Sequence, residues 1–346
     1  MNSTIAVLLA QNGLTNGAIY ALLALVLVMV FSVTRIILIP QGEIVAYSAL
    51  TLAAVRSGEV PGIVWLLLGA GLVAATMELL AARRPGGHEG SIRTAVAYAV
   101  LPAAVAGLAW ITVPLRPGLW FDLAMTLLLV VPLGPLMYRI AFRPLANASV
   151  LVLLIVAMAV HYVLTGLGLV FFGAEGVRSP ALLAGRVELA GISLSLQALF
   201  VIGASLGMIV AMAFFFGTTL RGKALRATAF NRTGARLVGI RTASAGMLAF
   251  VLAGLIGAIS GLLIAPLTTV YYDTGFLIGL KGFVAGILGG LVSYPLAALG
   301  AIGIGLLESY ASFWASVFKD VIVFSLLIPM LLWRSLKATD LEENEE

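Results

Sequence analysis

The chain has 346 residues, of which 62% are hydrophobic and only 10% are charged, whereas a soluble domain has roughly half and a quarter. This composition excludes a water-soluble globular protein, because apolar runs of about 20 residues need an apolar solvent and can cross a hydrocarbon layer roughly 30 Å thick. There is no cysteine, so disulfide and thiol chemistry are excluded, and with two histidines, His88 and His161, we expect no metal site. The composition predicts a polytopic membrane protein.

The net charge of +5 conceals an uneven distribution along the chain. Five of the fifteen acidic residues lie in the last seven positions, which predicts an acidic tail at 338–346. A basic balance in the rest of a membrane protein usually reflects Lys and Arg retained on the cytoplasmic side. Because there is no polar domain to carry a binding surface, we do not expect nucleic acid as a partner.

Apolar runs separated by short charged segments follow one another along the whole chain. Only helices are credible for them, because a membrane barrel would show segments of about ten residues with alternating polarity. We therefore predict an all-α bundle of about 10–11 spans in a single transmembrane domain, 1–346. The runs at 277–293 and 320–334 are short, which makes them candidates for re-entrant helices. The runs are 5–33, 37–56, 62–82, 94–114, 119–141, 148–172, 192–217, 243–266, 277–293, 296–316 and 320–334.

Basic residues are unequally shared between the two sets of connecting segments. If every run crosses and Met1 is outside, fourteen Lys and Arg lie inside and six outside. This bias predicts that the 218–242 loop and the 338–346 tail are cytoplasmic. No Lys or Arg precedes the first run, so we expect that run to be a retained span rather than a cleaved signal peptide.

Glycines recur four residues apart in several runs. In lipid, small residues allow the close backbone approach that packs helices together. We therefore expect helix contacts at Gly13/Gly17, Gly203/Gly207, Gly257/Gly261 and along Gly282, Gly286 and Gly290.

The segment 218–242 contains six basic residues and no acidic one. Its part 223–238 lacks proline and carries spaced Ala and Leu residues, which predicts one amphipathic helix on the inner membrane surface. On such a helix Ala235 and Gly239 would share a face, because they are four residues apart. A plain positive-inside loop and a docking site for a partner both fit this pattern.

The sequence of 226–240, Arg-Ala-Thr-Ala-Phe-Asn-Arg-Thr-Gly-Ala-Arg-Leu-Val-Gly-Ile, resembles a loop of a known family. The family is that of the permease subunits of branched-chain amino acid ABC importers, the leucine/isoleucine/valine type, whose cytoplasmic loop is the coupling helix that seats in the ATPase. Phe230 replaces the first member of the family's acidic or amide pair. The resemblance implies that the coupling residues are Arg226, Ala229, Phe230, Asn231, Ala235 and Gly239.

Three further segments resemble the same family in the same order, at 12–22, 41–43 and 281–321. Two of these segments each contain a carboxylate within an apolar run, Glu43 and Glu308. Placing an ionised carboxylate in a membrane costs several kcal/mol of free energy unless it faces a bundle interior or water. We therefore expect these two at a pathway or gate. With the matching residues they form the expected path set: Asn12, Gly17, Tyr20, Gln41, Gly42, Glu43, Lys281 and Glu308.

Two other ionisable residues lie in apolar runs outside these segments. Glu78 is about one turn from Arg83 and Arg84, so we expect an interfacial ion pair with one of them. His161 stands alone on an apolar helix, which is typical of a hydrogen-bonded core histidine. The segment 61–114, which holds Glu78, has no counterpart in the resemblance and is interpreted as a two-helix insertion.

The resemblance implies a permease subunit that forms the path for branched-chain or other aliphatic amino acids in the bacterial inner membrane, while relatives of the family handle urea, short amides and aromatic acids. Its partners would be a second permease subunit, two ATPase subunits, a soluble solute-binding protein and the lipid bilayer. The chain lacks a Gly-x-x-x-x-Gly-Lys-Ser/Thr loop, so we expect no enzyme activity and no cofactor of its own, with ATP bound by partner subunits.

Two other function classes are weighed against this one. An ion-coupled secondary transporter of a small polar solute is the alternative, because Glu43 and Glu308 permit a carboxylate pathway. An intramembrane enzyme has little support, since no His-Glu-x-x-His and no pair of Asp residues with catalytic spacing occurs.

Overall fold

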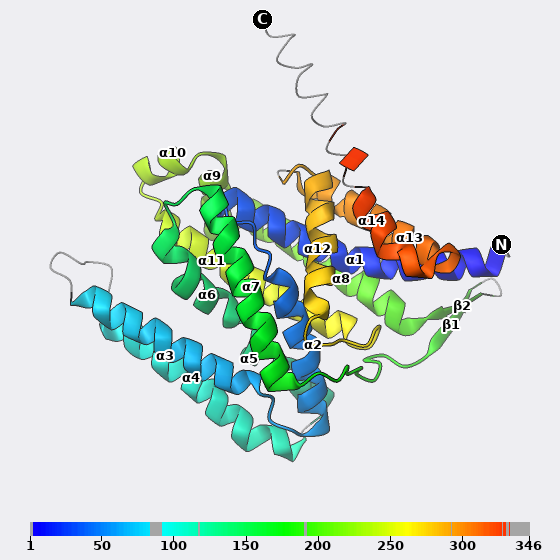
Figure 1. Cartoon of the computed structure of the whole chain (residues 1–346), viewed down its shortest axis with the longest axis horizontal. Coiled ribbons are helices and arrows are strands. Elements are labelled where there is room, and N and C mark those ends of the chain that lie inside the picture. Colours follow the sequence, from blue (N-terminus) through cyan, green and yellow to red (C-terminus); the bar gives the residue numbers. More distant parts are fainter. Residues whose placement is uncertain are drawn as a thin grey trace, which may run out of the picture. The chain divides into compact units, whose positions relative to one another are not determined.

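The computed structural model describes residues 3–83, 92–116, 118–189, 192–291, 293–326, 328–329 and 332 (Figure 1). The predicted acidic tail at 338–346 and the residues His88 and Arg84 lie outside this range. The chain divides into two compact units, each assembled from segments that are far apart in sequence. Unit 1 comprises Met1–Val28, Leu183–Gly207 and Leu280–Glu346, and unit 2 comprises Met29–Leu182 and Met208–Gly279.

Among the described residues, eight helical segments are long and apolar enough to cross a membrane. They confirm the prediction of a polytopic helical bundle. Two further predicted runs form shorter helices, α2 (Gln41–Ser57) and α12 (Thr274–Leu288), and the last run begins with α14 (Lys319–Ser325). The eight are α1 (Ser3–Thr34), α3 (Ile63–Ala82), α4 (Ile92–Thr112) with η1 (Val113–Leu115), the series α5 (Leu119–Val130), α6 (Leu133–Met137), η2 (Tyr138–Phe142) and η3 (Arg143–Leu145), α7 (Val150–Phe172), α8 (Leu196–Thr218), α11 (Thr242–Ile264) and α13 (Tyr294–Trp314).

Helix α2 is the core element of unit 2, since all but a few of its residues are buried. It begins after Pro40, whose fixed φ suits a helix start, and it ends at Gly58, which has a positive φ of 79°. Its partner α11 presents Gly257 to the Gln41 side chain and Gly261 to that of Ser48, with no room for a methyl group at either glycine. The predicted contact at this glycine pair is therefore confirmed.

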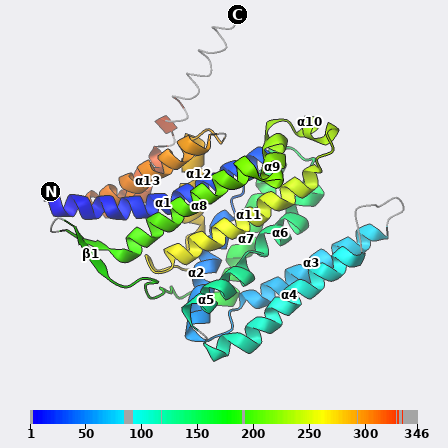
Figure 2. The same ribbon diagram turned by 180° about the vertical axis from the view of Figure 1, so that it is seen from behind.

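Helices α3 and α4 lie side by side as a hairpin in both views (Figures 1 and 2). Gly71 of α3 approaches the Tyr98 carbonyl and the Pro102 ring so closely that no side chain would fit. Near the start of α3 and the end of α4, the rings of Trp65 and Trp110 meet edge to face, with centroids 6.1 Å apart. Helices α3 and α4 cover nearly the same residues as the predicted insertion at 61–114. That this segment is an insertion stays a prediction.

In unit 1, α1 packs on α13, where Gly13 and Gly17 face the backbone of Leu306 and Ile302. This confirms the contact expected at the first glycine pair. Gly203 and Gly207 of α8 face open space instead, so none of the described residues makes the contact expected there. A short antiparallel hairpin precedes α8, with β1 (Arg186–Leu189) paired to β2 (Ile192–Ser195) in a register that sets Arg186 opposite Ser195.

Candidate translocation and coupling sites

A buried polar cluster in unit 1 joins three of the residues expected to line the path. Glu308 on α13 accepts a hydrogen bond from the Tyr20 hydroxyl on α1 at its Oε2, over 2.7 Å. The other carboxylate oxygen, Oε1, lies 2.5 Å from Nζ of Lys281 on α12. Lys281 also contacts Oδ1 of Asp320 on α14 at 2.9 Å. Tyr20, Lys281 and Glu308 are all buried. Together with Asp320 they join helices α1, α12, α13 and α14 at one charged cluster.

The charges of this cluster do not cancel, because one ammonium group faces two carboxylates. Nζ of Lys281 also lies 5.9 Å from the centre of the Tyr20 ring, within the range of a cation–π contact. Removing charges from water costs several kcal/mol for each ion, and it is offset only where the partners are well placed. Removing Lys281 would therefore leave two carboxylates of the cluster without their shared countercharge.

A second buried pair lies in unit 2, between α2 and α7. Oε1 of Glu43 is 2.7 Å from Nδ1 of His161, while Oε2 of Glu43 is buried and has no hydrogen-bond partner among the described residues. The Phe276 ring stacks near the imidazole, with centroids 4.7 Å apart. The expectation that His161 is a hydrogen-bonded core histidine is confirmed, and its partner is a residue of the expected path set.

The remaining residues of the path set take packing or exposed positions. Gln41 is buried and donates from Nε2 to the Ala253 carbonyl at 3.1 Å. Gly42 lies so close to the Gly275 backbone that any side chain would clash. Gly17 lies in the helix contact described above, and Asn12 is exposed on α1. Neither Asn12 nor Gly17 belongs to the two polar clusters.

The 218–242 loop forms two helices, α9 (Leu220–Phe230) and α10 (Arg232–Leu237). The prediction of one helix over 223–238 is wrong, because the backbone leaves the helical conformation at Asn231, with φ −148° and ψ 102°. The Asn231 side chain then accepts a hydrogen bond from the Gly234 N–H at 2.8 Å. This is the geometry of an N-cap, which starts a new helix.

Helix α10 ends in a glycine turn. Gly239 has φ +86° and donates its N–H to the Arg236 carbonyl at 3.0 Å, while the Ile240 N–H reaches the Ala235 carbonyl at 2.9 Å. These two bonds define a Schellman end. The expected shared face of Ala235 and Gly239 is therefore wrong, because the helix has ended before Gly239. Ala235 itself is 4% exposed and packs within the chain.

Large apolar side chains are exposed on this loop, and we call them the exposed apolar set. Their exposed fractions lie between 76% and 95%, although the rest of the loop is basic. Of the expected coupling residues only Phe230 belongs to the set, whereas Arg226 is exposed and Ala229 is half-buried. Sequence reasoning missed the other members, and the missed signal was a large apolar residue at each end of α9 and at the C-terminal end of α10. The set is Leu220, Phe230, Leu237 and Val238.

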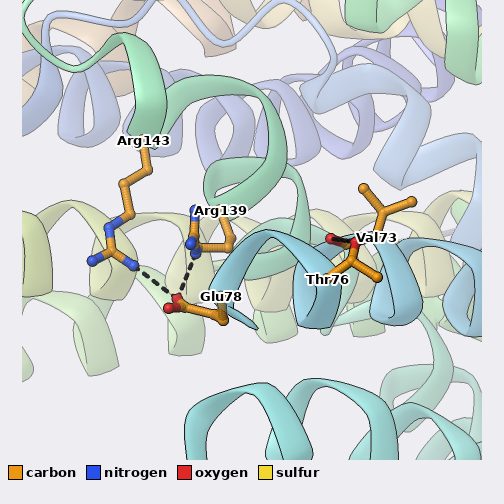
Figure 3. A network of polar contacts seen from close by, with 5 residues as sticks. All are labelled: Val73, Thr76, Glu78, Arg139 and Arg143. Carbon is orange, nitrogen blue, oxygen red and sulfur yellow. Dashed lines mark hydrogen bonds and ion pairs between the residues drawn. The ribbon is translucent and has the colours of Figure 1, made fainter. Parts of the chain in front are cut away.

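Glu78 on α3 binds two arginines from a later segment (Figure 3). Its Oε1 lies 2.6 Å from Nε of Arg139 and 3.1 Å from Arg143. The predicted pairing with Arg83 is wrong, and Arg84 lies outside the described residues. The reason is the direction of the side chain: Glu78 is buried against η2, whereas Arg83 is exposed at the end of α3.

Comparison with known proteins gives a consistent result. The family model described as branched-chain amino acid transport system / permease component matches residues 9–331. The chain is 28% identical to the high-affinity branched-chain amino acid transport system permease protein LivH of Escherichia coli (strain K12), over 93% of this chain and 91% of LivH. It is 25% identical to the corresponding protein BraD of Pseudomonas aeruginosa, over 93% and 92%.

A shorter match links the chain to another import system. Over 85 residues, 24% of each chain, it is 38% identical to the autoinducer 2 import system permease protein LsrC of Yersinia enterocolitica. No solved structure matches the chain.

Proposed function

The chain belongs to the family of permease components of branched-chain amino acid transport systems, and we propose that its solute is a branched-chain or related aliphatic amino acid. It is a multi-pass permease subunit of the bacterial cytoplasmic membrane, and no comparison favours the ion-coupled alternative. The proposal on the solute is supported by relatives that match over 93% of the chain and carry this solute class in their names.

A permease component of such a system acts with ATP-hydrolysing and solute-binding subunits. Our proposal for the assembly is a second permease subunit, two ATPase subunits and one soluble solute-binding protein. In this arrangement the chain holds no cofactor and catalyses no reaction, and ATP is bound by the partner subunits.

The exposed apolar set supports an ATPase-docking role for the 218–242 loop. Four large apolar side chains exposed on a short basic loop are unfavourable in water, and a protein interface would bury them. The six basic residues around it would steer an acidic partner surface towards the loop. In this proposal Phe230 and Val238 enter the ATPase, whereas Ala235 holds α10 against its own chain.

This docking role can be tested by co-purification of the ATPase with the permease. The variant Phe230→Ser/Val238→Ser should insert normally and lose the ATPase, because the apolar contacts are removed while the backbone is unchanged. The matched control is Val317→Ser, which removes an equally exposed valine outside the loop. Wild-type amounts of ATPase on the double variant would refute the docking role.

The transport activity itself is tested in vesicles that contain the complete importer. Leucine uptake should require ATP on the ATPase side and the solute-binding protein on the other. It should continue after ion gradients are collapsed with ionophores. Uptake that stops with the gradients would support the secondary transporter instead.

For the translocation path, we propose that the cluster of Tyr20, Lys281 and Glu308 is a gate and that the Glu43 and His161 pair lines the route. Charged centres buried in membrane-spanning segments usually mark a pathway. The gate proposal predicts that Lys281→Met changes the rate of uptake more than it changes assembly with the ATPase. Equal loss of both would indicate a purely structural cluster.

We also propose that the chain is oriented in the membrane with its 218–242 loop on the cytoplasmic side. Reporter fusions after Arg178 and after Phe230 should report opposite sides of the membrane. Two fusions on the same side would overturn this topology.

A further inference from the structure

An arginine-rich cavity of about 570 Å³ lies in unit 2, beside the α3–α4 hairpin. Its walls come from α3, from η2 with the segment that follows it, from α10 and from the start of α11. None of the described residues that line it is acidic. We call it the arginine cavity, after Arg139, Arg143, Arg232 and Arg236.

Among the described residues, two of the four arginines of this cavity, Arg232 and Arg236, have no carboxylate partner. Glu78, just outside the lining, binds Arg139 and Arg143 with one oxygen (Figure 3). Arg232 donates to the Ala146 carbonyl at 3.4 Å, and Arg236 donates to the Thr242 hydroxyl at 3.1 Å. These two acceptors carry no charge.

One guanidinium atom of a lining residue has no acceptor within the described part of the chain. Nε of Arg232 is buried and makes no hydrogen bond to any described residue. A buried donor without an acceptor destabilises the fold. The cavity therefore has space, excess positive charge and an unused donor, which together favour an anionic ligand with several acceptor oxygens.

Guanidinium groups bind phosphate particularly well, because their planar fork matches two of its oxygens. The ligand must also fit the apolar wall, to which α3 contributes Met77, Leu80 and Ala81. Leu80 is 62% exposed on a helix that is long and apolar enough to cross the membrane. A phosphate beside an exposed, membrane-facing apolar surface is the arrangement of a phospholipid at its headgroup.

We propose that the arginine cavity binds the phosphate of an anionic phospholipid. Basic pockets between membrane helices on the cytoplasmic side favour such headgroups, and the basic-residue bias places this end of α3 on that side. The lipid would then bridge the hairpin and α10. This site is separate from the exposed apolar set and does not depend on ATPase docking.

The test uses the purified importer complex in detergent and native mass spectrometry. Phosphatidylglycerol and phosphatidylcholine with identical acyl chains are titrated against the wild type. The wild type should retain phosphatidylglycerol preferentially. Arg232→Gln/Arg236→Gln should weaken its binding roughly 30-fold, and Arg236→Gln alone roughly fivefold, at about 1 kcal/mol per charge.

The control is Arg221→Gln/Lys223→Gln, which removes the same charge from exposed residues of α9 outside the cavity. It should retain phosphatidylglycerol within about twofold of the wild type. An equal loss in the control would overturn the proposal in favour of diffuse attraction, and unchanged binding in the Arg232 and Arg236 variants would overturn it outright.

Two further outcomes would assign the cavity to another ligand. Displacement of phosphatidylglycerol by millimolar inorganic phosphate would identify a soluble anion as the occupant. Loss of the ATPase from the Arg232 and Arg236 variants, with phosphatidylglycerol binding unchanged, would identify an acidic segment of that partner. Either result contradicts the lipid site.

Discussion

Oε1 of Glu43 lies 2.7 Å from Nδ1 of His161, and this contact joins the first turn of α2 to the middle of α7, 118 positions later. Both side chains are buried, so neither can exchange its partner for water. In the part of the chain that the structure describes, the second carboxylate oxygen of Glu43 has no hydrogen-bond partner. The pair therefore fixes two helices through one contact and leaves an acceptor available next to it.

The first prediction is that the two residues are strongly coupled. Glu43→Leu or His161→Leu alone should lower the free energy of unfolding by about 3 kcal/mol, because each leaves a buried polar partner unsatisfied. The double variant should lose much less than the sum. Denaturation of all four proteins in detergent measures this coupling. Additive losses would show that the contact contributes little.

The second prediction concerns the Tyr20 hydroxyl, which donates to Glu308 at 2.7 Å. Tyr20→Phe should cost about 1.5–3 kcal/mol, as expected for a hydrogen bond to a charged group. The control is Tyr310→Phe, because that hydroxyl donates to the neutral Ala6 carbonyl at 3.2 Å. Its loss should cost about 1 kcal/mol or less. Equal losses of unfolding free energy in the two variants would mean that Glu308 is not charged in this contact.

The ionisable residues of the sites could be found from the sequence, but their partners could not. Glu43, Lys281 and Glu308 stand out because charged groups are rare in apolar runs. Which helices meet depends on packing between distant segments, and sequence spacing carries no information about it. For Glu78, the sequence spacing predicts an ion pair with Arg83 or Arg84, about one turn away. The side chain instead points towards η2 and pairs with Arg139.

The 218–242 loop shows the opposite case, because its structural signals are local in the sequence. Asn231 is a preferred N-cap residue, and Gly239 is the preferred residue after a helix end. Together they predict a short helix between them, as observed for α10. The absence of proline favours one continuous helix, but the capping residues Asn231 and Gly239 determine the observed helix ends.

The third prediction tests this helix end. Gly239→Ala places a side chain at φ +86°, which should cost about 1 kcal/mol and fray α10. Hydrogen exchange at the Ile240 amide should accelerate, because its bond to Ala235 depends on that turn. The control Gly217→Ala lies in α8 with open space around it and no positive φ, so exchange at Ile240 should not change. Unchanged exchange in both variants would contradict the role of Gly239.

The last prediction combines the ion pair of Glu78 with the arginine cavity. Glu78→Gln should lower the free energy of unfolding by about 3 kcal/mol, because it leaves the buried Arg139 without a countercharge. Arg83→Gln, an exposed residue on the same helix, should change it by less than about 0.5 kcal/mol. If the cavity binds anionic lipid, Glu78→Gln should also strengthen phosphatidylglycerol binding roughly fivefold, since one competing negative charge is gone. Weaker phosphatidylglycerol binding in a variant that is still folded would show that Glu78 orients the arginines for the lipid rather than competing with it, and unchanged stability would refute the buried ion pair.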